Sequence, residues 1–465
     1  MLPLLGLLAA TLSPHDSLSP QVRRFVQVDA PVIVLRHVRV IDGTGAPPRE
    51  DQTLMIRDGR IAALGDEGKV TVPDSARVLD LTGKSVIPGL VMVHEHLFYP
   101  TGENTYANLS ESFTRLYLAG GVTSMRTGGN LNGYGEIEIA KAIARGLKPG
   151  PWIDATAPYL EGPGLPLTQV ATTTTPEAAR RMVSFWAAAG ATSFKAYMHI
   201  SRAVLRAAIV AAHARGLKVT GHLCSVTYAE AAELGIDDLE HGFFAATDFV
   251  PGKPPDGCVP AANPAITAAA LDTARPALKA LIATLIRHRV ALTSTLTVFE
   301  TSVPGRPEPP GLDVLVPELR EDFARRRAAV AGRSPDYQAS YRAGALAELA
   351  FFRAGGLLLA GTDPTGGGGV IPGFADQREL ELLVEAGLTP VQAIMVGTLN
   401  GARYLGRATL VGSLAVGKQA DLVVLNGDPS RDIADIRKVV LVFKQGVGYD
   451  PEKLIASVRG RVGLF

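Results

Sequence analysis

Short apolar runs of strand length alternate with longer segments of helical periodicity through the middle of the chain. Eight runs predict strands, at residues 90–96, 122–128, 152–160, 192–198, 218–224, 237–242, 290–298 and 357–363. Between them, segments such as SRAVLRAAIVAAHARG (201–216) place apolar residues three and four positions apart, as in an amphipathic helix. Eight strands that alternate with helices predict a (β/α)8 TIM barrel.

The two ends of the chain have a different pattern, with short alternating runs and frequent turn residues. Residues 30–88 are rich in Val, Ile, Gly and Asp, and a similar pattern returns at 412–428 and 438–450. Short strands at both ends predict one small β-sandwich domain beside the barrel. The expected architecture is therefore α/β, with a β-sandwich from 29–88 and 405–465, and a barrel from 89–404.

An open, doubly wound sheet is the alternative to the barrel. A dinucleotide-binding version of that fold would have a glycine-rich phosphate loop after its first strand. The chain has His94-Glu95-His96 at that position instead. A length of 465 residues also suits a large barrel with a smaller second domain better than a single core.

The composition indicates a globular and nearly neutral protein. Hydrophobic residues make up 47% and charged residues 20%, and 46 Lys and Arg against 45 Asp and Glu leave a net charge of +1. There is no basic excess for nucleic acid and no second apolar segment that reads as a membrane span. We therefore expect a small-molecule substrate as the partner, and a homo-oligomer is compatible with the sequence.

The N-terminal segment, residues 1–28, begins with the apolar run MLPLLGLLAATL, which is too short to span a bilayer. It is similar to the hydrophobic part of a secretory signal but lacks the basic residues that precede one. The alternative is an apolar arm packed on the folded body. We favour export to an extracytoplasmic compartment over a cytoplasmic location. Cys224 and Cys258 are the only cysteines and do not form a disulfide framework that would identify the compartment.

Side chains with metal-binding chemistry stand at the ends of the predicted strands: His94, His96, Lys195, His222, His241 and Asp363. His94 and His96 are two residues apart and therefore share one face of a strand, at the end where barrel active sites form. Neutral imidazole suits zinc, although a single histidine such as His222 or His241 is more often part of a core. It is the set, in strand order, that indicates a metal site.

Lys195 and Asp363 each have a structural alternative. A strand-end lysine usually extends its ammonium group to solvent, whereas a buried one is costly unless paired or modified. We interpret Lys195 as carbamylated by carbon dioxide, which converts it into a carboxylate able to bridge two metals. Asp363 could cap a turn. We interpret it instead as a metal ligand and the catalytic group that moves a proton from water to the leaving group.

This hypothesis predicts two divalent ions, with zinc favoured by the ligand set. A shared water whose pKa falls toward about 7 would supply hydroxide for attack on a substrate carbonyl. The predicted reaction is therefore metal-dependent hydrolysis.

These residues, in this order, resemble the amidohydrolase superfamily through the motifs IPGLVMVHEH, SFKAYM, VTGHLC, LEHG, LAGTDP and VGSLAVGKQADLVVLNGDP. The resemblance implies a binuclear centre with these ligands: His94, His96 and Asp363 on one ion, His222 and His241 on the other, and a carbamate on Lys195 between them. The family often has an aspartate where this chain has Met92. Because that residue is not a ligand, the metal assignment is unaffected.

Within the superfamily, the chain is most similar to the imidazolonepropionase-related and prolidase-like branch, which includes dipeptidases. The deaminases of the superfamily differ, since they lack the bridging lysine and have a glutamate where this chain has Ser225. A hydrolase of cyclic amides, of the dihydropyrimidinase or imidazolonepropionase type, is a closer alternative because FKAYM resembles its lysine strand. A barrel that has lost catalysis would be expected to lack ligands, and none is missing.

Three residues are candidates for substrate contacts. Tyr197 shares a strand face with Lys195 and could donate a hydrogen bond to the scissile carbonyl. Arg126 could pair with a substrate carboxylate, although a salt bridge inside the barrel is an equal alternative. Tyr99 could line the pocket or pack beside it. The expected reaction is hydrolysis of a carbon–nitrogen amide bond in a dipeptide-like or N-acyl amino acid substrate.

Overall fold

The computed structural model describes residues 18–102, 105–259 and 264–464. The apolar run at residues 1–12 lies outside these ranges, so the interpretation of a signal-like segment stays a prediction. Within the described ranges, no helix combines the length and the apolar character that a membrane crossing requires.

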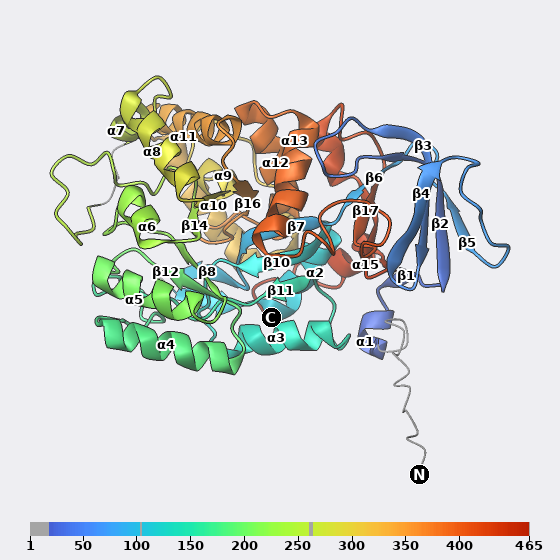
Figure 1. The fold of residues 1–465 in the computed structure, drawn as a ribbon, viewed down its shortest axis with the longest axis horizontal. Helices are drawn as coiled ribbons and strands as arrows, with labels where there is room; N and C mark the ends of the chain where they lie inside the picture. The colour runs from blue at the N-terminus through green and yellow to red at the C-terminus, as the bar shows by residue number, and fades with distance from the viewer. Residues whose placement is uncertain (1–17, 103–104, 260–263, 465) are drawn as a thin grey trace, which may run out of the picture.

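A nine-stranded sheet, on the right in Figure 1, combines strands from both ends of the chain. Its path is β1-β19-β18-β17-β6-β2-β3-β4, and β5 pairs in parallel with β2. The strands are β1 (Val26–Val28), β2 (Val32–Val40), β3 (Arg49–Arg57), β4 (Arg60–Asp66), β5 (Arg77–Asp80), β6 (Ser85–Pro88), β17 (Leu422–Leu425), β18 (Val439–Lys444) and β19 (Val447–Tyr449).

The two chain ends meet where β17 lies antiparallel to β6, with Leu422 opposite Pro88. Every residue of both strands is buried. The run LVVL of β17 is apolar throughout and has two β-branched valines at its centre, which suits a strand that is buried on both faces. Along the chain, β6 is followed directly by the first strand of the central region.

The central region contains eight parallel strands in two sheets, β11-β10-β7 and β12-β13-β14-β15-β16. The strands are β7 (Leu90–Glu95), β10 (Val122–Thr127), β11 (Trp152–Asp154), β12 (Ser193–Ala196), β13 (Lys218–Gly221), β14 (Asp238–Glu240), β15 (Ala291–Ser294) and β16 (Leu358–Ala360). Each falls within one of the eight predicted runs. The fold is therefore mixed α/β.

The two parallel sheets meet along irregular seams, so the ladder is not one continuous ring. At one seam, isolated parallel bridges join Thr156 to Ser193 and Leu160 to Ala196. At the other, the backbone nitrogens of Thr362 and Asp363 both donate to the carbonyl oxygen of His94 at 3.1 Å. A closed barrel was expected from the alternating pattern, and closure of the ring stays a prediction.

Helices cover the central sheets on their outer side, with α3, α4 and α5 along the lower edge of Figure 1 and α8, α11 and α12 along the upper part. The helices are α1 (Pro20–Arg23), α2 (Ser110–Ala119), α3 (Tyr134–Ala144), α4 (Pro176–Ala189), α5 (Arg202–His213), α6 (Tyr228–Leu234), α7 (Pro264–Ala270), α8 (Pro276–Arg287), α9 (Leu296–Glu300), α10 (Pro317–Ala331), α11 (Asp336–Arg353), α12 (Phe374–Ala386), α13 (Pro390–Met395), α14 (Gly401–Tyr404) and α15 (Pro451–Ala456). Short 3-10 or π turns are η2 (Leu312–Val314), η3 (Val396–Asn400) and η4 (Ile433–Arg437).

Local signals account for several helix ends. Helix α6 begins with a capping box, in which Thr227 and Glu230 each accept a hydrogen bond from the other's backbone nitrogen, and it ends at Gly235 in the left-handed conformation. Helix α5 begins at the N-cap Ser201, whose side chain accepts from the backbone of Val204. These ends are set by residues within a few positions, which is why the sequence pattern predicts them.

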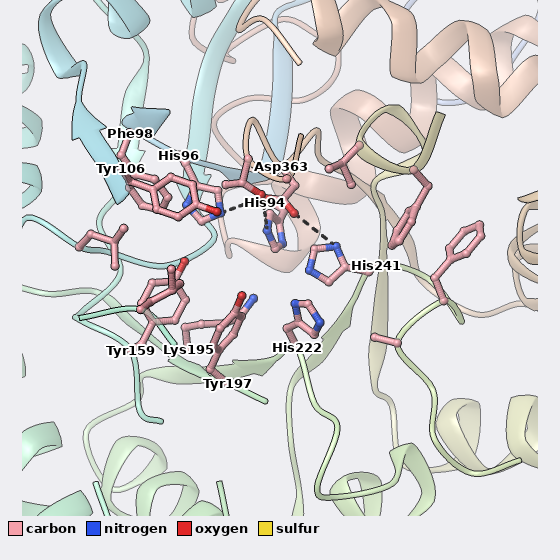
Figure 2. Close-up of a pocket in the computed structure, with 18 residues that line it drawn as sticks. His94, His96, Phe98, Tyr106, Tyr159, Lys195, Tyr197, His222, His241 and Asp363 are labelled. Carbon is pink, nitrogen blue, oxygen red and sulfur yellow. Dashed lines mark hydrogen bonds and ion pairs between the residues drawn. The ribbon is translucent and has the colours of Figure 1, made fainter. Parts of the chain in front are cut away.

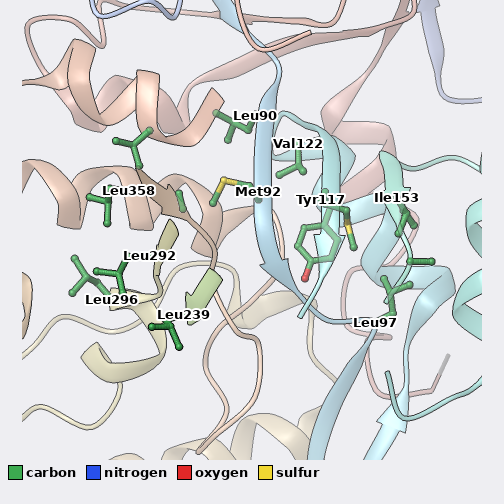
Figure 3. Packing of buried hydrophobic residues seen from close by; sticks show 14 of the residues in the cluster. Leu90, Met92, Leu97, Tyr117, Val122, Ile153, Leu239, Leu292, Leu296 and Leu358 are labelled. Atoms are coloured by element: carbon green, nitrogen blue, oxygen red, sulfur yellow. The ribbon is translucent and has the colours of Figure 1, made fainter. Parts of the chain in front are cut away.

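The main hydrophobic core lies around the parallel strands, as Figure 3 shows for residues such as Leu90, Leu292 and Leu358. Met92 occupies the position at which the family that this sequence resembles often has an aspartate. Its side chain is fully buried in this core. It therefore contributes apolar packing beneath the histidine pair.

A hairpin and a disulfide complete the surroundings of the strand ends. Strands β8 (Phe98–Gly102) and β9 (Thr105–Asn108) pair antiparallel directly after β7. The disulfide joins Cys224 to Cys258 and thereby ties the loop after β14 to the chain just beyond β13. This pairing could not be predicted from the sequence, because two cysteines alone identify no disulfide framework.

Candidate metal centre

The six predicted ligands line one cavity of about 280 Å³ at the ends of the parallel strands (Figure 2). They come from five strands. His94 and Lys195 lie within β7 and β12, and three residues follow a strand directly: His96 after β7, His222 after β13 and His241 after β14. Asp363 lies three residues beyond the end of β16. Parallel strands present these ends at the same edge, which brings distant parts of the chain together.

Asp363 is the centre of the ligand cluster. Its Oδ1 lies 3.1 Å from His96 Nε2 and 3.7 Å from His94 Nε2, and its Oδ2 lies 3.8 Å from His241 Nδ1. Donor atoms of His94, His96 and Asp363 all lie within 4.8 Å of one another, close enough to share one ion. The ring of His222 lies 4.3 Å from that of His241, centroid to centroid.

The backbone is strained at two of these positions. His241 has φ 70° and Asp363 has φ 54°, in the left-handed region that residues other than glycine seldom adopt. Such a conformation costs about 1–3 kcal/mol and persists only where the surrounding structure imposes it. Both residues are buried. The strain at the two side chains that approach each other supports a functional role for this geometry.

The imidazoles of the site are neutral at neutral pH. Burial lowers the pKa of His94 and His96 to about 4 and that of His222 to about 3, and it holds the pKa of His241 well below its usual value. Burial alone would raise the pKa of Asp363, but hydrogen bonds with His94 and His96 hold it well below its usual range. Neutral imidazole and ionised carboxylate are the forms that ligate metals.

These groups fit a divalent metal by their chemistry. The ring nitrogens of His222 have no hydrogen-bond partner among the residues that the structure describes, and Figure 2 shows the ring facing the cavity beside His241. Nitrogen ligands with one or two carboxylates suit zinc and its neighbours. The four imidazoles and the carboxylate of Asp363 are therefore already in the protonation states that bind a metal ion.

Lys195 is 1% exposed, and burial lowers its pKa well below the usual value. Its Nζ contacts Glu240, a carboxylate with no solvent exposure. Glu240 also accepts from Arg126 at 3.1 Å and from Thr220 Oγ1 at 2.6 Å, and its Oε2 lies 3.3 Å from His94 Nδ1. Glu240 thus links the lysine to the first histidine beneath the cavity.

Glu240 was not among the predicted site residues, because attention to strand ends singled out only its neighbour His241. One sequence signal was present. Asp238 and Glu240 are two positions apart in DDLEHG, so both face the same side of a strand, and both are fully buried. Two acidic residues on a buried strand face require partners, and such a pair indicates a polar network.

Glu240→Gln is expected to destabilise the metal-free protein by about 3–5 kcal/mol, because it leaves the buried guanidinium of Arg126 without its anion. Urea unfolding of the metal-free protein measures this loss. Glu138→Gln is the matched control, since Glu138 pairs with Lys141 on the surface with 64% of its side chain exposed. That change should cost less than about 1 kcal/mol. Equal stability of the two variants would show that the Glu240 network is not structural.

The three predicted substrate contacts have different positions. Tyr197 lines the cavity, with its ring 5.0 Å from that of His222. Arg126 is 1% exposed and does not line it; its guanidinium donates to Ser193, Thr220, Glu240 and the carbonyl of Val93. This geometry favours the internal salt bridge over a substrate contact.

Tyr99 does not line the cavity either, and it is 2% exposed. Its hydroxyl accepts a hydrogen bond of 2.8 Å from the backbone nitrogen of Gly369. Tyr99 therefore anchors the glycine-rich segment that follows Asp363, and it acts on the cavity by holding that loop.

Other lining residues come from loops, from the β8–β9 hairpin and from α9. They are Phe98, Tyr106, Leu131, Tyr159, Leu167, Phe244, Ala245, Val298, Phe299, Thr365 and Gly366.

Comparisons with known proteins agree with the motifs. A sequence model of the amidohydrolase family matches residues 340–448, a segment that contains Asp363. The imidazolonepropionase of Geobacillus kaustophilus is 55% identical over 40 residues, 9% of each chain. The dihydroorotase of Anaeromyxobacter dehalogenans is 34% identical over 122 residues, 25% of this chain and 27% of the relative. The chain thus aligns with about a quarter of that relative's length.

Solved structures match over nearly the whole chain. A protein from Bifidobacterium longum, provisionally described as a prolidase, is 27% identical with a TM-score of 0.67, over 92% of this chain and 98% of the other. A Xaa-Pro dipeptidase with bound methionine is 18% identical with a TM-score of 0.68, over 90% of this chain and 100% of the other. At that identity, the second likeness concerns the fold alone.

Proposed function

The chain belongs to the amidohydrolase superfamily, and from that premise we propose that it is a metal-dependent hydrolase of a carbon–nitrogen amide bond. The main support is the convergence of six predicted ligands from five strands on one cavity, with Asp363 3.1 Å from His96. Dipeptide-like and N-acyl amino acid substrates fall within this proposal, and the likeness to the Bifidobacterium longum protein that is provisionally described as a prolidase supports an amide substrate.

The proposed centre holds two divalent ions, with zinc favoured by the ligands. His94, His96 and Asp363 would hold one ion, His222 and His241 the other, and a carbamate on Lys195 would bridge them. When bound, the ions activate water and polarise the substrate carbonyl. The lowered pKa of Lys195 favours the uncharged amine, which is the form that reacts with carbon dioxide.

Asp363 has the position of the proton carrier. As an ionised carboxylate it can accept a proton from the attacking water and then deliver it to the leaving nitrogen. Hydrogen bonds with two histidines hold it in place, and its neighbour Thr365 donates to its Oδ1 at 2.8 Å. The carboxylate is thus oriented before the substrate arrives, which favours catalysis.

Hydrolysis of a cyclic amide is a second candidate, favoured by the alignments with dihydroorotases and an imidazolonepropionase. Deamination has less support, because Ser225 occupies the position of the catalytic glutamate and its hydroxyl is buried, donating to the carbonyl of Ile200 at 2.5 Å. A non-catalytic role is disfavoured by the complete ligand set.

We also propose that the two parallel sheets act as one (β/α)8 barrel over residues 89–404. In this proposal 29–88 and 405–465 form the second domain, and their pairing through β6 and β17 supports that division.

Removal of metal by a chelator is expected to abolish amide hydrolysis, and added zinc is expected to restore it. Metal analysis of the purified protein should find about two ions per chain, as a binuclear site requires. The activity screen should include dipeptides, N-acyl amino acids, cyclic amides and lactones. Undiminished turnover by metal-free protein would contradict the proposal, and a protein that is purified without metal yet stays folded and oligomeric would favour a binding role.

A further inference from the structure

We propose that the substrate of this site is a neutral amide that has an aromatic or aliphatic group and no free carboxylate. This inference rests on the proposed hydrolase function and narrows its substrate class. Dipeptides and N-acyl amino acids become poor substrates, whereas their counterparts without the carboxylate become good ones.

The first observation is the absence of a free cation from the cavity wall. Lys195 is the one lysine or arginine among the described lining residues, and it contacts the buried Glu240. The parts of the chain outside the description, residues 1–17, 103–104, 260–263 and 465, contain no lysine or arginine. A substrate carboxylate that enters a buried site needs a paired cation, and protein recognition usually supplies an arginine.

Two arginines near the site are already committed. Arg126 lies beneath the cavity and donates to four oxygen atoms, including one of Glu240 at 3.1 Å. Arg326 of α10 lies near Tyr106, whose pKa is raised to about 12 by burial, an increase that this arginine only partly offsets. Arg326 pairs with Asp322 at 2.7 Å and does not line the cavity. Arg326 therefore offers no guanidinium group at the wall of the cavity.

The second observation is the aromatic wall on both sides of the imidazoles. Phe98 lies 4.4 Å from the ring of His96, and Tyr106 lies 5.3 Å from Phe98 on the same side (Figure 2). On the other side, Phe299 lies 5.9 Å from His241 and stacks on Phe244 at 4.1 Å. Aliphatic residues complete the wall, and these are Leu131, Leu167, Ala245 and Val298. Such walls favour an apolar or aromatic substrate group.

The third observation is a pair of free hydroxyl groups. Tyr159 and Tyr197 lie with their rings 4.8 Å apart and both line the cavity. Neither hydroxyl has a hydrogen-bond partner among the residues that the structure describes. Neutral hydroxyl donors suit the carbonyl oxygen of an uncharged amide, carbamate or urea. The cavity of about 280 Å³ lies at the small end of the roughly 300–1,000 Å³ that is usual for ligand pockets, so the substrate is small.

The test uses two compounds that differ only in the carboxylate, N-benzoylproline and N-benzoylpyrrolidine, with the metal-loaded protein. The expected kcat/KM is at least about tenfold higher for N-benzoylpyrrolidine, because the proline carboxylate finds no free lysine or arginine side chain among the described lining residues. Calorimetry with the metal-free protein should also find tighter binding of N-benzoylpyrrolidine. Faster turnover of N-benzoylproline, or no binding of either compound, would overturn the inference.

The Arg326→Gln variant tests whether Arg326, the remaining arginine near the cavity, could bind a substrate carboxylate and so reverse the preference for N-benzoylpyrrolidine. The ratio of the two kcat/KM values should be unchanged in this variant. A preference for N-benzoylproline that disappears with Arg326→Gln would place a carboxylate subsite at Arg326 and reject the neutral class. Failure of the hydrolase proposal has a different signature, which is absence of turnover for every amide in the screen by protein that holds its metal.

Discussion

Replacing Asp363 by asparagine is expected to lower kcat by about 10²–10⁴-fold, the range that a proton-transfer group contributes, while most of the metal stays bound. Asparagine keeps the size of the side chain and one oxygen for the contact with His96, but it cannot take a proton from water. The histidines remain as ligands. Steady-state kinetics and metal analysis of the same preparation measure both effects.

Asp272→Asn is the matched control for this variant. Asp272 is exposed between α7 and α8, and its side chain accepts from the backbone of Ala274, which asparagine can also do. Its activity should equal that of the parent protein. Near-normal activity of Asp363→Asn would contradict the role assigned to the carboxylate, and loss of most metal would make that role one of ligation alone.

Lys195→Ala is expected to lose both metal and activity, the latter by at least about 100-fold, since even outer-shell substitutions cost up to that factor. The substitution removes the proposed bridging carbamate and leaves Glu240 buried without its lysine. Metal content after desalting and kcat/KM measure the two losses. Lys141→Ala, on the surface of α3, is the control that should change neither.

Chemical rescue distinguishes two roles for Lys195, a carbamate that bridges the metal ions and a lysine that only stabilises the structure. A short carboxylic acid such as propionate can occupy the space left in Lys195→Ala and is expected to restore part of the metal content and activity. Lys195→Met fills that space with an apolar chain and should not respond. Equal behaviour of the two variants, or near-normal activity in Lys195→Ala, would count against the carbamate.

Local patterns were sufficient for the strands and for the residues that gather at one cavity, whose role as metal ligands stays a prediction. All eight parallel strands lie within predicted runs, because a buried parallel strand is a continuous apolar run whatever its neighbours are. The proposed ligands His96 and Asp363 end such runs, His94 and Lys195 lie near the ends of their strands, and the strand order then places all four at one edge. This is why the cavity could be anticipated from the chain.

Where a distant residue decides the local conformation, the pattern was misleading. The predicted strand 290–298 ends at Ser294 and continues as α9 from Leu296. The reason is Glu379 of α12, whose carboxylate accepts from the backbone nitrogens of Leu296 and Thr297 at 3.1 and 3.0 Å. A helix start capped by another helix has no signature in its own residues.

The chain by itself determined the alternation of strands and helices and the residue types that end the strands, because periodicity and side-chain chemistry are properties of neighbouring positions. Only the tertiary structure decided that Arg126 is held by Glu240 and that aromatic residues from separate parts of the chain enclose the cavity. Those contacts join positions far apart in sequence. Their energies come from burial and charge pairing, which depend on what surrounds a side chain after folding.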